Sequence, residues 1–176
     1  MRAIETKAAV VAYRKPTLAD AAAVHALIDE CKPLDLNSRY AYMLLCTHFA
    51  DTCAVAERDG NLLGFVSGYR KPSDDAVLFV WQVAVSPRAR GQGVGKELLE
   101  EIAARPEQAQ VRYLEATIGP SNRASWALFT SFATKHGAAC AKEALFEPKD
   151  FGGQEHEAEQ LLRIGPFESP RRNRKG

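Results

Sequence analysis

The sequence predicts one α/β domain, a mixed central sheet of about seven strands with helices on both faces. The chain has 176 residues, of which 46% are hydrophobic and 26% charged, the usual proportions of a folded globular domain. Strand-like and helix-like segments alternate along it, which favours helices layered on a sheet. The run Val77 to Val85 is almost wholly apolar, so we expect it in the middle of the sheet, covered on both sides.

Local signals place the other elements. A first helix begins after Pro16 and Thr17 and ends before Pro33, because the residue preceding a proline avoids the helical region. A second helix begins near residues 37–38. Asp59-Gly60-Asn61 between two apolar runs is a strong hairpin signal. We expect strands at 10–13, 52–59, 62–70, 77–85, 111–118, 141–146 and 158–164, and helices at 18–31, 39–49, 96–105 and 121–137.

The two ends differ from the middle. Residues 1–9 are expected to form a flexible leader, residues 10–167 the folded domain, and residues 168–176 a basic, disordered tail without apolar partners. A net charge of +1 argues against a nucleic-acid partner. No apolar stretch is long enough to span a bilayer, and charges stand where a signal peptide needs an apolar run. We expect a cytoplasmic protein without a membrane partner.

The four cysteines predict no metal site. They form no C-x-x-C pair, and no two histidines have a metal-binding helical spacing. Cys46, His48 and Cys53 lie close in sequence, which leaves a metal site there as a minor alternative. Small apolar core residues and a polar helix end explain the same residues better, so no metal is expected.

A glycine-rich segment, residues 86–95, carries the first functional signal. It follows the apolar strand and opens a helix, where free backbone N–H groups and the helix dipole attract phosphate. Glycines lack a Cβ, so an anion approaches the main chain closely. The phosphate-binding candidates are Arg88, Arg90, Gly91, Gln92, Gly93, Val94, Gly95 and Lys96.

Two common phosphate loops do not fit this segment. A Walker loop needs four residues between its glycines and then Lys with Ser or Thr. Here Gly91 and Gly95 enclose three residues, and Glu97 follows Lys96. The dinucleotide pattern G-x-G-x-x-G is also absent. The remaining structural alternative is that the glycines only permit close packing of strand and helix.

The segment Arg90 to Gly95 resembles the R/Q-x-x-G-x-G/A loop of the N-acetyltransferases of the GNAT superfamily, which cradles the pyrophosphate of acetyl-coenzyme A (acetyl-CoA). Residues 121–129 are similar to the family's N-x-x-A-x-x-L-Y helix, with Asn122 on the asparagine that faces the cofactor. The resemblance assigns Asn122, Trp126 and Phe129 to the cofactor. Phe129 departs from the family tyrosine and cannot protonate the leaving thiolate.

The resemblance also implies how the fold performs acetyl transfer. The strand before the loop and the strand after its helix splay apart, and the acetyl-pantetheine arm enters the gap. Val83 and Val85 would bind that arm through the main chain, opposite a wall at residues 115–118. A backbone N–H near Val83 or Ala84 would stabilise the oxyanion, which is worth ~3 kcal/mol in well-studied enzymes. An acceptor amine would attack directly in a ternary complex after losing a proton to a carboxylate or water.

Three segments, 33–53, 78–93 and 163–166, resemble bacterial L-2,4-diaminobutyrate acetyltransferases of the ectoine pathway. The similarity covers about residues 11–167. It implies acetyl transfer to the γ-amine of diaminobutyrate, giving N4-acetyl-L-2,4-diaminobutyrate, the precursor of a compatible solute. Such enzymes commonly form homodimers.

The acceptor substrate carries two ammonium groups and one carboxylate. Asp35, in the loop between the first two helices, is expected to hold an ammonium group, although it is also a candidate cap for the second helix. Asn37, Ser38 and Tyr40 are candidates for the substrate carboxylate or amine, with capping or packing as the alternative.

Further acceptor residues come from the sheet. The face of Trp81 is a candidate for attracting a cation, with burial in the core as the alternative. Thr117 belongs to the opposite wall. Glu159 is the candidate ammonium anchor or proton acceptor, and His156 would accept the proton or orient that glutamate. Glu157 is a rival of Glu159 on the same side of the strand. For these three C-terminal residues, an exposed edge is the alternative.

Two other functions stay open from the sequence. The same scaffold serves acetyltransferases for other small amines or peptides, in which case the glycine loop holds and the acceptor residues do not. A non-catalytic CoA-binding protein is the third reading, and Phe129 is its only support.

Overall fold

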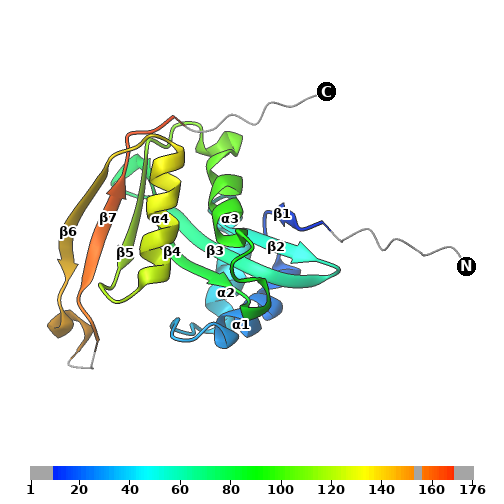
Figure 1. Cartoon of the computed structure of the whole chain (residues 1–176). Coiled ribbons are helices and arrows are strands. Elements are labelled where there is room, and N and C mark those ends of the chain that lie inside the picture. Colours follow the sequence, from blue (N-terminus) through cyan, green and yellow to red (C-terminus); the bar gives the residue numbers. More distant parts are fainter. Residues whose placement is uncertain (1–9, 153–155, 169–176) are drawn as a thin grey trace, which may run out of the picture.

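A computed structural model describes residues 10–152 and 156–168 (Figure 1). Its sheet has seven strands in the order β1-β2-β3-β4-β5-β7-β6. Strands β4 and β5 pair in parallel and the other neighbours in antiparallel, which confirms the mixed sheet. The strands are β1 (Ala12–Arg14), β2 (Ala54–Arg58), β3 (Asn61–Lys71), β4 (Asp74–Val85), β5 (Tyr113–Ile118), β6 (Cys140–Phe146) and β7 (Glu159–Ile164).

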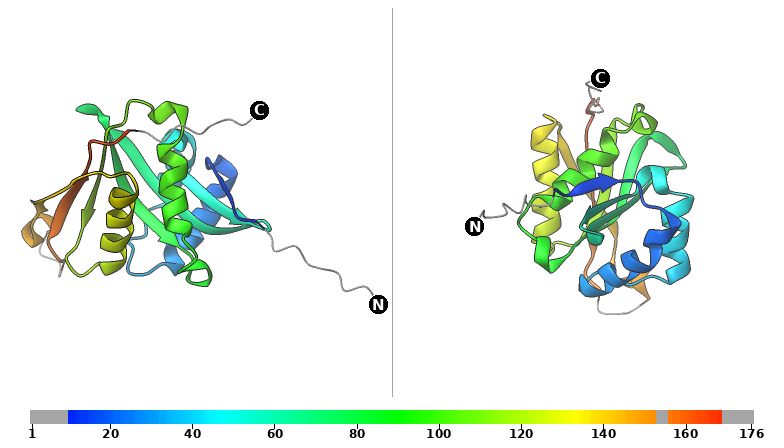
Figure 2. Two further views of the ribbon diagram at one scale, coloured as in Figure 1. Left: turned by 45° about the horizontal axis from the view of Figure 1, so that its top comes forward. Right: turned by 90° about the vertical axis from the view of Figure 1, so that its right-hand side faces the viewer.

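Helices cover both faces of the sheet, as expected (Figure 2). They are α1 (Ala21–Glu30), α2 (Arg39–Thr47), α3 (Val94–Ala103) and α4 (Arg123–Lys135). On one face, residues of α3 and α4 such as Leu98 and Phe132 share a core with Leu78 and Leu114. On the other face, α1 and α2 bury a smaller core around Phe65. These two cores fix the sheet between two helical layers.

Strands β4 and β5 pair over a short stretch and then separate. The described pairs end at Phe79 with Glu115, while β4 continues to Val85. Opposite β3, Ser67 pairs with Gln82 and Gly68 with Val80, so Trp81 is the extra residue of a bulge. A bulge bends its strand and increases its twist. The splay between the central strands is therefore present (Figure 1), and the bulge lies just beyond the last β4–β5 pair.

The bulge explains two sequence features. A Cβ on Gly68 would lie 2.6 Å from the carbonyl oxygen of Phe79, so only glycine permits this close approach. Trp81 is 48% exposed, which corrects the expectation that the whole run from Val77 to Val85 is covered on both sides. The end of β4 has no paired neighbour on the β5 side among the described residues, and the bulge turns Trp81 out of the core.

Helix α3 begins at Val94, two residues before the expected start at 96. Gly93 is the N-cap residue, with a left-handed φ of 79°, and no side chain caps the helix. Lys96 therefore lies in the first helical turn and not at the helix start. This start places the first helical amides beside the glycine loop.

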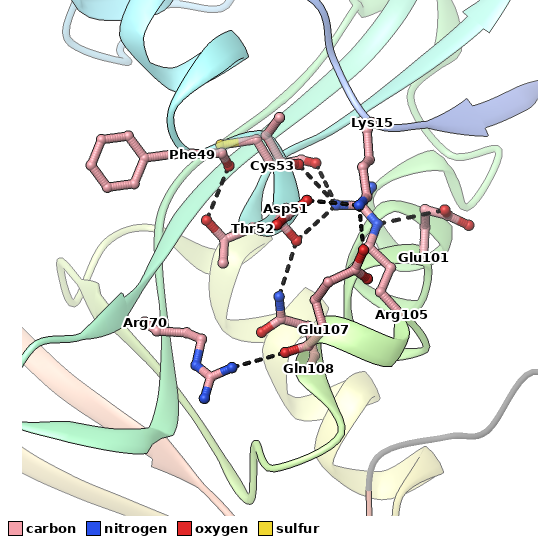
Figure 3. A network of polar contacts seen from close by, with 11 residues as sticks. Lys15, Phe49, Asp51, Thr52, Cys53, Arg70, Glu101, Arg105, Glu107 and Gln108 are labelled. Atoms are coloured by element: carbon pink, nitrogen blue, oxygen red, sulfur yellow. Dashed lines mark hydrogen bonds and ion pairs between the residues drawn. The ribbon is translucent and has the colours of Figure 1, made fainter.

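The far end of α3 is anchored by a buried arginine (Figure 3). Arg105 is 6% exposed and donates hydrogen bonds to the carbonyl oxygens of Ala50, Asp51 and Cys53, at 3.1, 3.0 and 2.8 Å. These residues form the connection from α2 to β2. The anchor thus ties the glycine-loop helix to the segment that follows α2.

Other expectations fall partly outside the described residues. The predicted leader at 1–9 lies outside them, as does the tail after residue 168. Among the helices described, none is long and apolar enough to cross a membrane. In the same residues, no group of three His, Cys, Asp or Glu side chains is arranged to hold a metal ion. Cys46 and Cys53 are buried, and burial raises their pKa values to about 11 and about 12.

Candidate active site

A cavity of about 660 Å³ lies where the end of β4, the glycine loop, α4 and the α1–α2 loop meet. Nine of the residues predicted to bind the cofactor line it: Val83, Val85, Arg90, Gly91, Gly93, Val94, Gly95, Lys96 and Asn122. The cavity is therefore bounded by the main chain of a strand on one side and by a helix N-terminus on another.

The amides at the start of α3 are open to this cavity. Within residues 10–152 and 156–168, the N–H groups of Gly93, Val94, Gly95 and Lys96 have no hydrogen-bond acceptor. A helix N-terminus with free N–H groups attracts anions. The side chains of Arg90 and Lys96 are exposed beside it and add positive charge. The arrangement fits a phosphate or pyrophosphate group.

The glycines of the loop serve different purposes. Gly91 and Gly93 have φ values of 75° and 79°, a region that other residues rarely adopt. A Cβ at either position would meet no atom within 4 Å, so backbone conformation and not space requires glycine. Gly95 lies in the helix, where a Cβ would make an ordinary contact with Leu128 at 3.5 Å. Only the first two glycines are needed for the shape of the loop.

The main chain of β4 presents hydrogen-bonding groups toward the gap. Ser86 N–H donates to the carbonyl of Leu63 at 2.8 Å, which fixes the alternation of the β3–β4 ladder. Val83 and Val85 therefore turn their N–H and C=O groups away from β3, toward the side that β5 has left. Ala84 faces β3, so its amide is a poorer candidate than that of Val83 for binding an oxyanion.

The face of helix α4 that lines the cavity differs from the one expected. Asn122 caps the helix by accepting a hydrogen bond from Ser125 N–H at 3.1 Å, and Ser125 lines the cavity. Phe129 is 3% exposed in the main core, and Trp126 Nε1 donates to the carbonyl of Gly119 at 3.1 Å. Neither Trp126 nor Phe129 lines the cavity. The helical period, counted from Asn122, points to Ser125 and Leu128 instead.

Arg88 and Gln92 also lie outside the cavity wall. Gln92 Nε2 donates to the carbonyl of Arg88 at 3.0 Å, and its backbone N–H donates to Ala89 at 3.4 Å. These two residues therefore brace the loop on its outer side.

The first half of the α1–α2 loop forms a wall of the cavity, whereas the sequence indicated only acceptor residues from Asp35 onward in this loop. Cys31, Lys32, Pro33 and Leu34 line the cavity. The thiol of Cys31 donates to the carbonyl of Val85 at 3.4 Å, and burial raises its pKa while nearby Arg90 lowers it. Farther along this loop, the carbonyl of Asp35 contacts the side chain of Gln82 on β4.

The predicted acceptor residues of this loop differ in what holds them. Ser38 accepts a hydrogen bond from Ala41 N–H at 3.2 Å, so it caps α2, as its alternative reading stated. Asp35 does not cap that helix; its carbonyl accepts from Gln82 Nε2 at 2.8 Å and its side chain is exposed. Asn37 N–H donates to the hydroxyl of Tyr42 at 3.2 Å. Tyr40 is 66% exposed.

Thr117 and Glu159 share the sheet face opposite α3 and α4. Leu114 and Leu162 lie in the core under those helices, so the alternation of side chains puts Thr117 and Glu159 on the other face. Thr117 is half-buried and lies just beyond the last β4–β5 pair. Glu159 is half-buried as well, at the start of β7.

His156 and Glu157 flank this carboxylate. His156 Nδ1 lies 2.7 Å from the carbonyl of Glu157, and its Nε2 lies 4.0 Å from a carboxylate oxygen of Glu159. A carbonyl only accepts, so Nδ1 carries the proton and Nε2 of the neutral ring is a proton acceptor. Glu157 accepts hydrogen bonds from the N–H and hydroxyl of Ser121 at 3.0 and 2.7 Å. The rival carboxylate is thus tied to the β5–α4 loop.

Sequence reasoning missed a buried charge at the closed end of the splay. Glu115 is 1% exposed, beside the last β4–β5 pair, and accepts hydrogen bonds from Arg163 and, at 2.7 Å, from Lys71. The sequence signal for it is a carboxylate inside a mainly apolar strand. The two cations satisfy it and fasten β5 to β3 and β7.

Comparison with known proteins identifies the family. The acetyltransferase (GNAT) family model matches residues 21–133. An L-2,4-diaminobutyric acid acetyltransferase of Bordetella parapertussis is 51% identical over 158 residues, which cover 89% of this chain and 85% of that protein. The protein of the same name from Halomonas elongata is 46% identical, over 89% of this chain and 81% of its own. The chain belongs to the L-2,4-diaminobutyric acid acetyltransferases of the GNAT family.

Solved structures agree with this family. The diaminobutyrate acetyltransferase of Paenibacillus lautus, solved with its substrate L-2,4-diaminobutyric acid and coenzyme A, is 41% identical. It aligns with a TM-score of 0.88 over 90% of this chain and 96% of its own. An acetyltransferase from Salmonella typhimurium, solved with acetyl-CoA, is 18% identical with a TM-score of 0.69, which supports the fold alone. The GNAT fold predicted from the glycine loop is therefore confirmed.

Proposed function

We propose that this GNAT acetyltransferase moves the acetyl group of acetyl-CoA to the γ-amine of L-2,4-diaminobutyrate, producing N4-acetyl-L-2,4-diaminobutyrate for ectoine synthesis. The observation that carries the proposal is the similarity to the Paenibacillus lautus enzyme, at 41% identity and a TM-score of 0.88, because that protein was solved with both diaminobutyric acid and coenzyme A. The splay between β4 and β5 supplies a place where donor and acceptor meet.

The donor would bind along the cavity. The free amides of residues 93–96, with Arg90 and Lys96, would hold its pyrophosphate, and the main chain of Val83 and Val85 its pantetheine arm. The Val83 N–H would stabilise the oxyanion formed at the thioester carbonyl. Arg88 and Gln92 would act at the rim of the loop, and Trp126 and Phe129 would support α4 from the core side.

The acceptor would bind on the other face of the gap. Asp35, Trp81 and Glu159 would hold its ammonium groups, and Asn37, Tyr40 and Thr117 would surround its carboxylate, whereas Ser38 caps α2. A free alkylamine has a pKa of about 10.4, so the γ-ammonium must lose a proton before it attacks. Glu159 or the Nε2 of His156 would accept that proton. The amine nitrogen then bonds to the carbonyl carbon and the carbon–sulfur bond breaks. The proton that the nitrogen loses on becoming an amide would reach the thiolate through water, because Phe129 has no proton to give.

We also propose a cytoplasmic homodimer. Strand β6 lies at the sheet edge and is exposed along its length, with Leu145 and Phe146 each 43% exposed. An exposed edge strand is a natural site for pairing with a second chain. All four cysteines are free, which suits a reducing compartment.

A thiol-release assay tests the reaction. Purified protein is given acetyl-CoA with diaminobutyrate, ornithine, lysine or spermidine, and coenzyme A release is followed. We expect kcat/KM for diaminobutyrate to exceed that for each other amine by about tenfold or more, as one methylene is worth 10-fold or more in a fitted pocket. Turnover with another amine alone would select a different acetyltransferase, and binding without turnover would select a non-catalytic CoA-binding protein.

Glu159→Gln tests the acceptor carboxylate. Loss of a charge that contacts an ammonium group should raise the KM for diaminobutyrate or lower kcat by about tenfold or more, with the KM for acetyl-CoA nearly unchanged. Glu157→Gln is the matched control, because that carboxylate is bonded to Ser121. Steady-state kinetics in both substrates measure the effect. Equal losses for donor and acceptor would assign Glu159 to the structure and not to the site.

A further inference from the structure

The loop between α1 and α2, residues 31–38, is attached to β4 at two places. We call this loop the strap. Its first half, which lines the cofactor cavity, is held by the thiol of Cys31 on Val85 and by the turn from Leu34 N–H to the carbonyl of Cys31 at 3.1 Å. Its second half, with the predicted acceptor residues, is held by a separate set of hydrogen bonds from Tyr42 and Gln82.

That second attachment is a continuous chain of hydrogen bonds. Asn37 N–H donates to the Tyr42 hydroxyl at 3.2 Å, and this hydroxyl donates to Gln82 Oε1 at 3.3 Å. Gln82 Nε2 donates in turn to the carbonyl of Asp35 at 2.8 Å. Tyr42 is 0% exposed and Gln82 5% exposed. Both side chains therefore use their polar groups to fix the main chain of the strap on either side of residue 36.

The two side chains are themselves held firmly. The ring of Tyr42 makes edge contacts with His25 and Phe65, at centroid distances of 5.9 and 6.4 Å. The backbone N–H of Gln82 donates to the Ser67 hydroxyl at 3.2 Å. Gln82 also stands between the bulged Trp81 and Val83. The position of Asp35 relative to the Val83 amide is thus set by β4 itself.

We propose that Tyr42 and Gln82 are positioning residues that fix the length of the acceptor pocket and so select a diamine of the size of diaminobutyrate. This inference rests on the proposed function. A rigid strap sets the separation between the group that holds one end of the diamine and the main chain that holds the thioester. Ornithine is one methylene longer, so it fits only if the strap moves outward.

The hydroxyl of Thr52 provides a matched comparison. Thr52 is 7% exposed, and its hydroxyl donates to the carbonyl of Gly68 at 2.7 Å, a contact that does not involve the strap. Tyr42→Phe and Thr52→Val each remove one buried hydroxyl from a core. A role confined to stability predicts similar consequences for both variants. A role in positioning predicts a change of specificity in Tyr42→Phe alone.

The experiment compares kcat/KM for diaminobutyrate and ornithine in the wild type, Tyr42→Phe and Thr52→Val. We expect Tyr42→Phe to reduce the preference for diaminobutyrate by about tenfold, the size expected when a buried partner is left unsatisfied, with the KM for acetyl-CoA within about twofold of wild type. Thr52→Val should keep the wild-type preference. Gln82→Glu, which keeps the acceptor for Tyr42 and loses the donor for Asp35, should change the preference in the same direction if Tyr42→Phe does not fold.

The outcomes separate this inference from the proposed function. A wild type that does not acetylate diaminobutyrate overturns both. An active wild type with an unchanged preference in Tyr42→Phe, or in Gln82→Glu where it is used instead, overturns only the role of the strap. An equal rise in the KM for acetyl-CoA and the KM for diaminobutyrate in Tyr42→Phe also overturns the role of the strap, because that result assigns Tyr42 to general stability.

Discussion

The two ends of α3 use polar groups in opposite ways. At the N-terminal end, the amides of residues 93–96 have no acceptor within the described residues and face a cavity. Just beyond the C-terminal end, buried Arg105 donates to three backbone carbonyls of the α2–β2 connection (Figure 3). One end leaves its N–H groups open to a cavity, whereas at the other end the Nη1 of Arg105 bonds to carbonyls inside the protein.

The two ends differ in their surroundings: the amides of residues 93–96 face a cavity, whereas Arg105 is buried. The open amides border a cavity, where an anion can take the place of water as their hydrogen-bond acceptor. The Arg105 guanidinium is enclosed, and burial lowers its pKa, so its carbonyl partners and nearby Glu101 must stabilise the charge. Because the anchored segment follows α2, the helix proposed to bind the donor is tied to the elements proposed to form the acceptor side.

Arg105→Met should give the largest effect on stability. It removes the donor for three carbonyls and the cation beside buried Glu101, and breaking a buried ionic contact typically costs ~3–5 kcal/mol. Arg105→Lys should recover part of this loss, because all three hydrogen bonds come from the single nitrogen Nη1 and an ammonium group also has three N–H donors. Urea unfolding measures the free energy. Acetyl-CoA affinity of the folded protein, measured at low temperature, should stay near that of wild type.

If Arg105→Met lost little stability but much of its affinity for acetyl-CoA, the contrast between the two ends of α3 would be wrong. That result would mean that Arg105 acts on the binding end of the helix, and the two ends would no longer be separate devices.

The sequence predicted the fold well because its signals are local. The hairpin at Asp59-Gly60, the proline after α1 and the apolar run of β4 each specify an element without knowledge of distant partners. The loop glycines were equally informative, since a positive φ at Gly91 and Gly93 is a property of the residue type. The start of α3 was misplaced because a glycine N-cap leaves no side-chain signal.

The site was predicted only in part because much of it depends on tertiary contacts. The strap hydrogen bonds join Tyr42 and Gln82, which are 40 residues apart in sequence. The bulge at Trp81 is set by pairing with β3 and leaves no local pattern. Which face of α4 lines the cavity depends on packing against the core, which buries Phe129 and leaves Ser125 at the cavity. Residue types identified the chemistry, but not which side chain faces the ligand.

The smallest effects on stability should come from two glycine variants at the N-terminal end of α3. These variants also test directly whether that end binds acetyl-CoA. Gly93→Ala places a Cβ on a left-handed residue at the cap of α3, which costs roughly 1–2 kcal/mol and displaces the amides that face the cavity. Gly95→Ala lies in a regular helix, and its Cβ makes ordinary contacts with Leu128 at 3.5 Å and Val85 at 3.7 Å, so it should stabilise the free protein by about 0.5–1 kcal/mol.

The pair separates loop geometry from the loss of a glycine as such. We expect Gly93→Ala to weaken acetyl-CoA binding by about tenfold in calorimetric titration, because each free amide is a charge-assisted donor to phosphate. Gly95→Ala should weaken binding less while raising the unfolding temperature. If Gly93→Ala bound acetyl-CoA like the wild type, the free amides of α3 would not be the anchor of the donor.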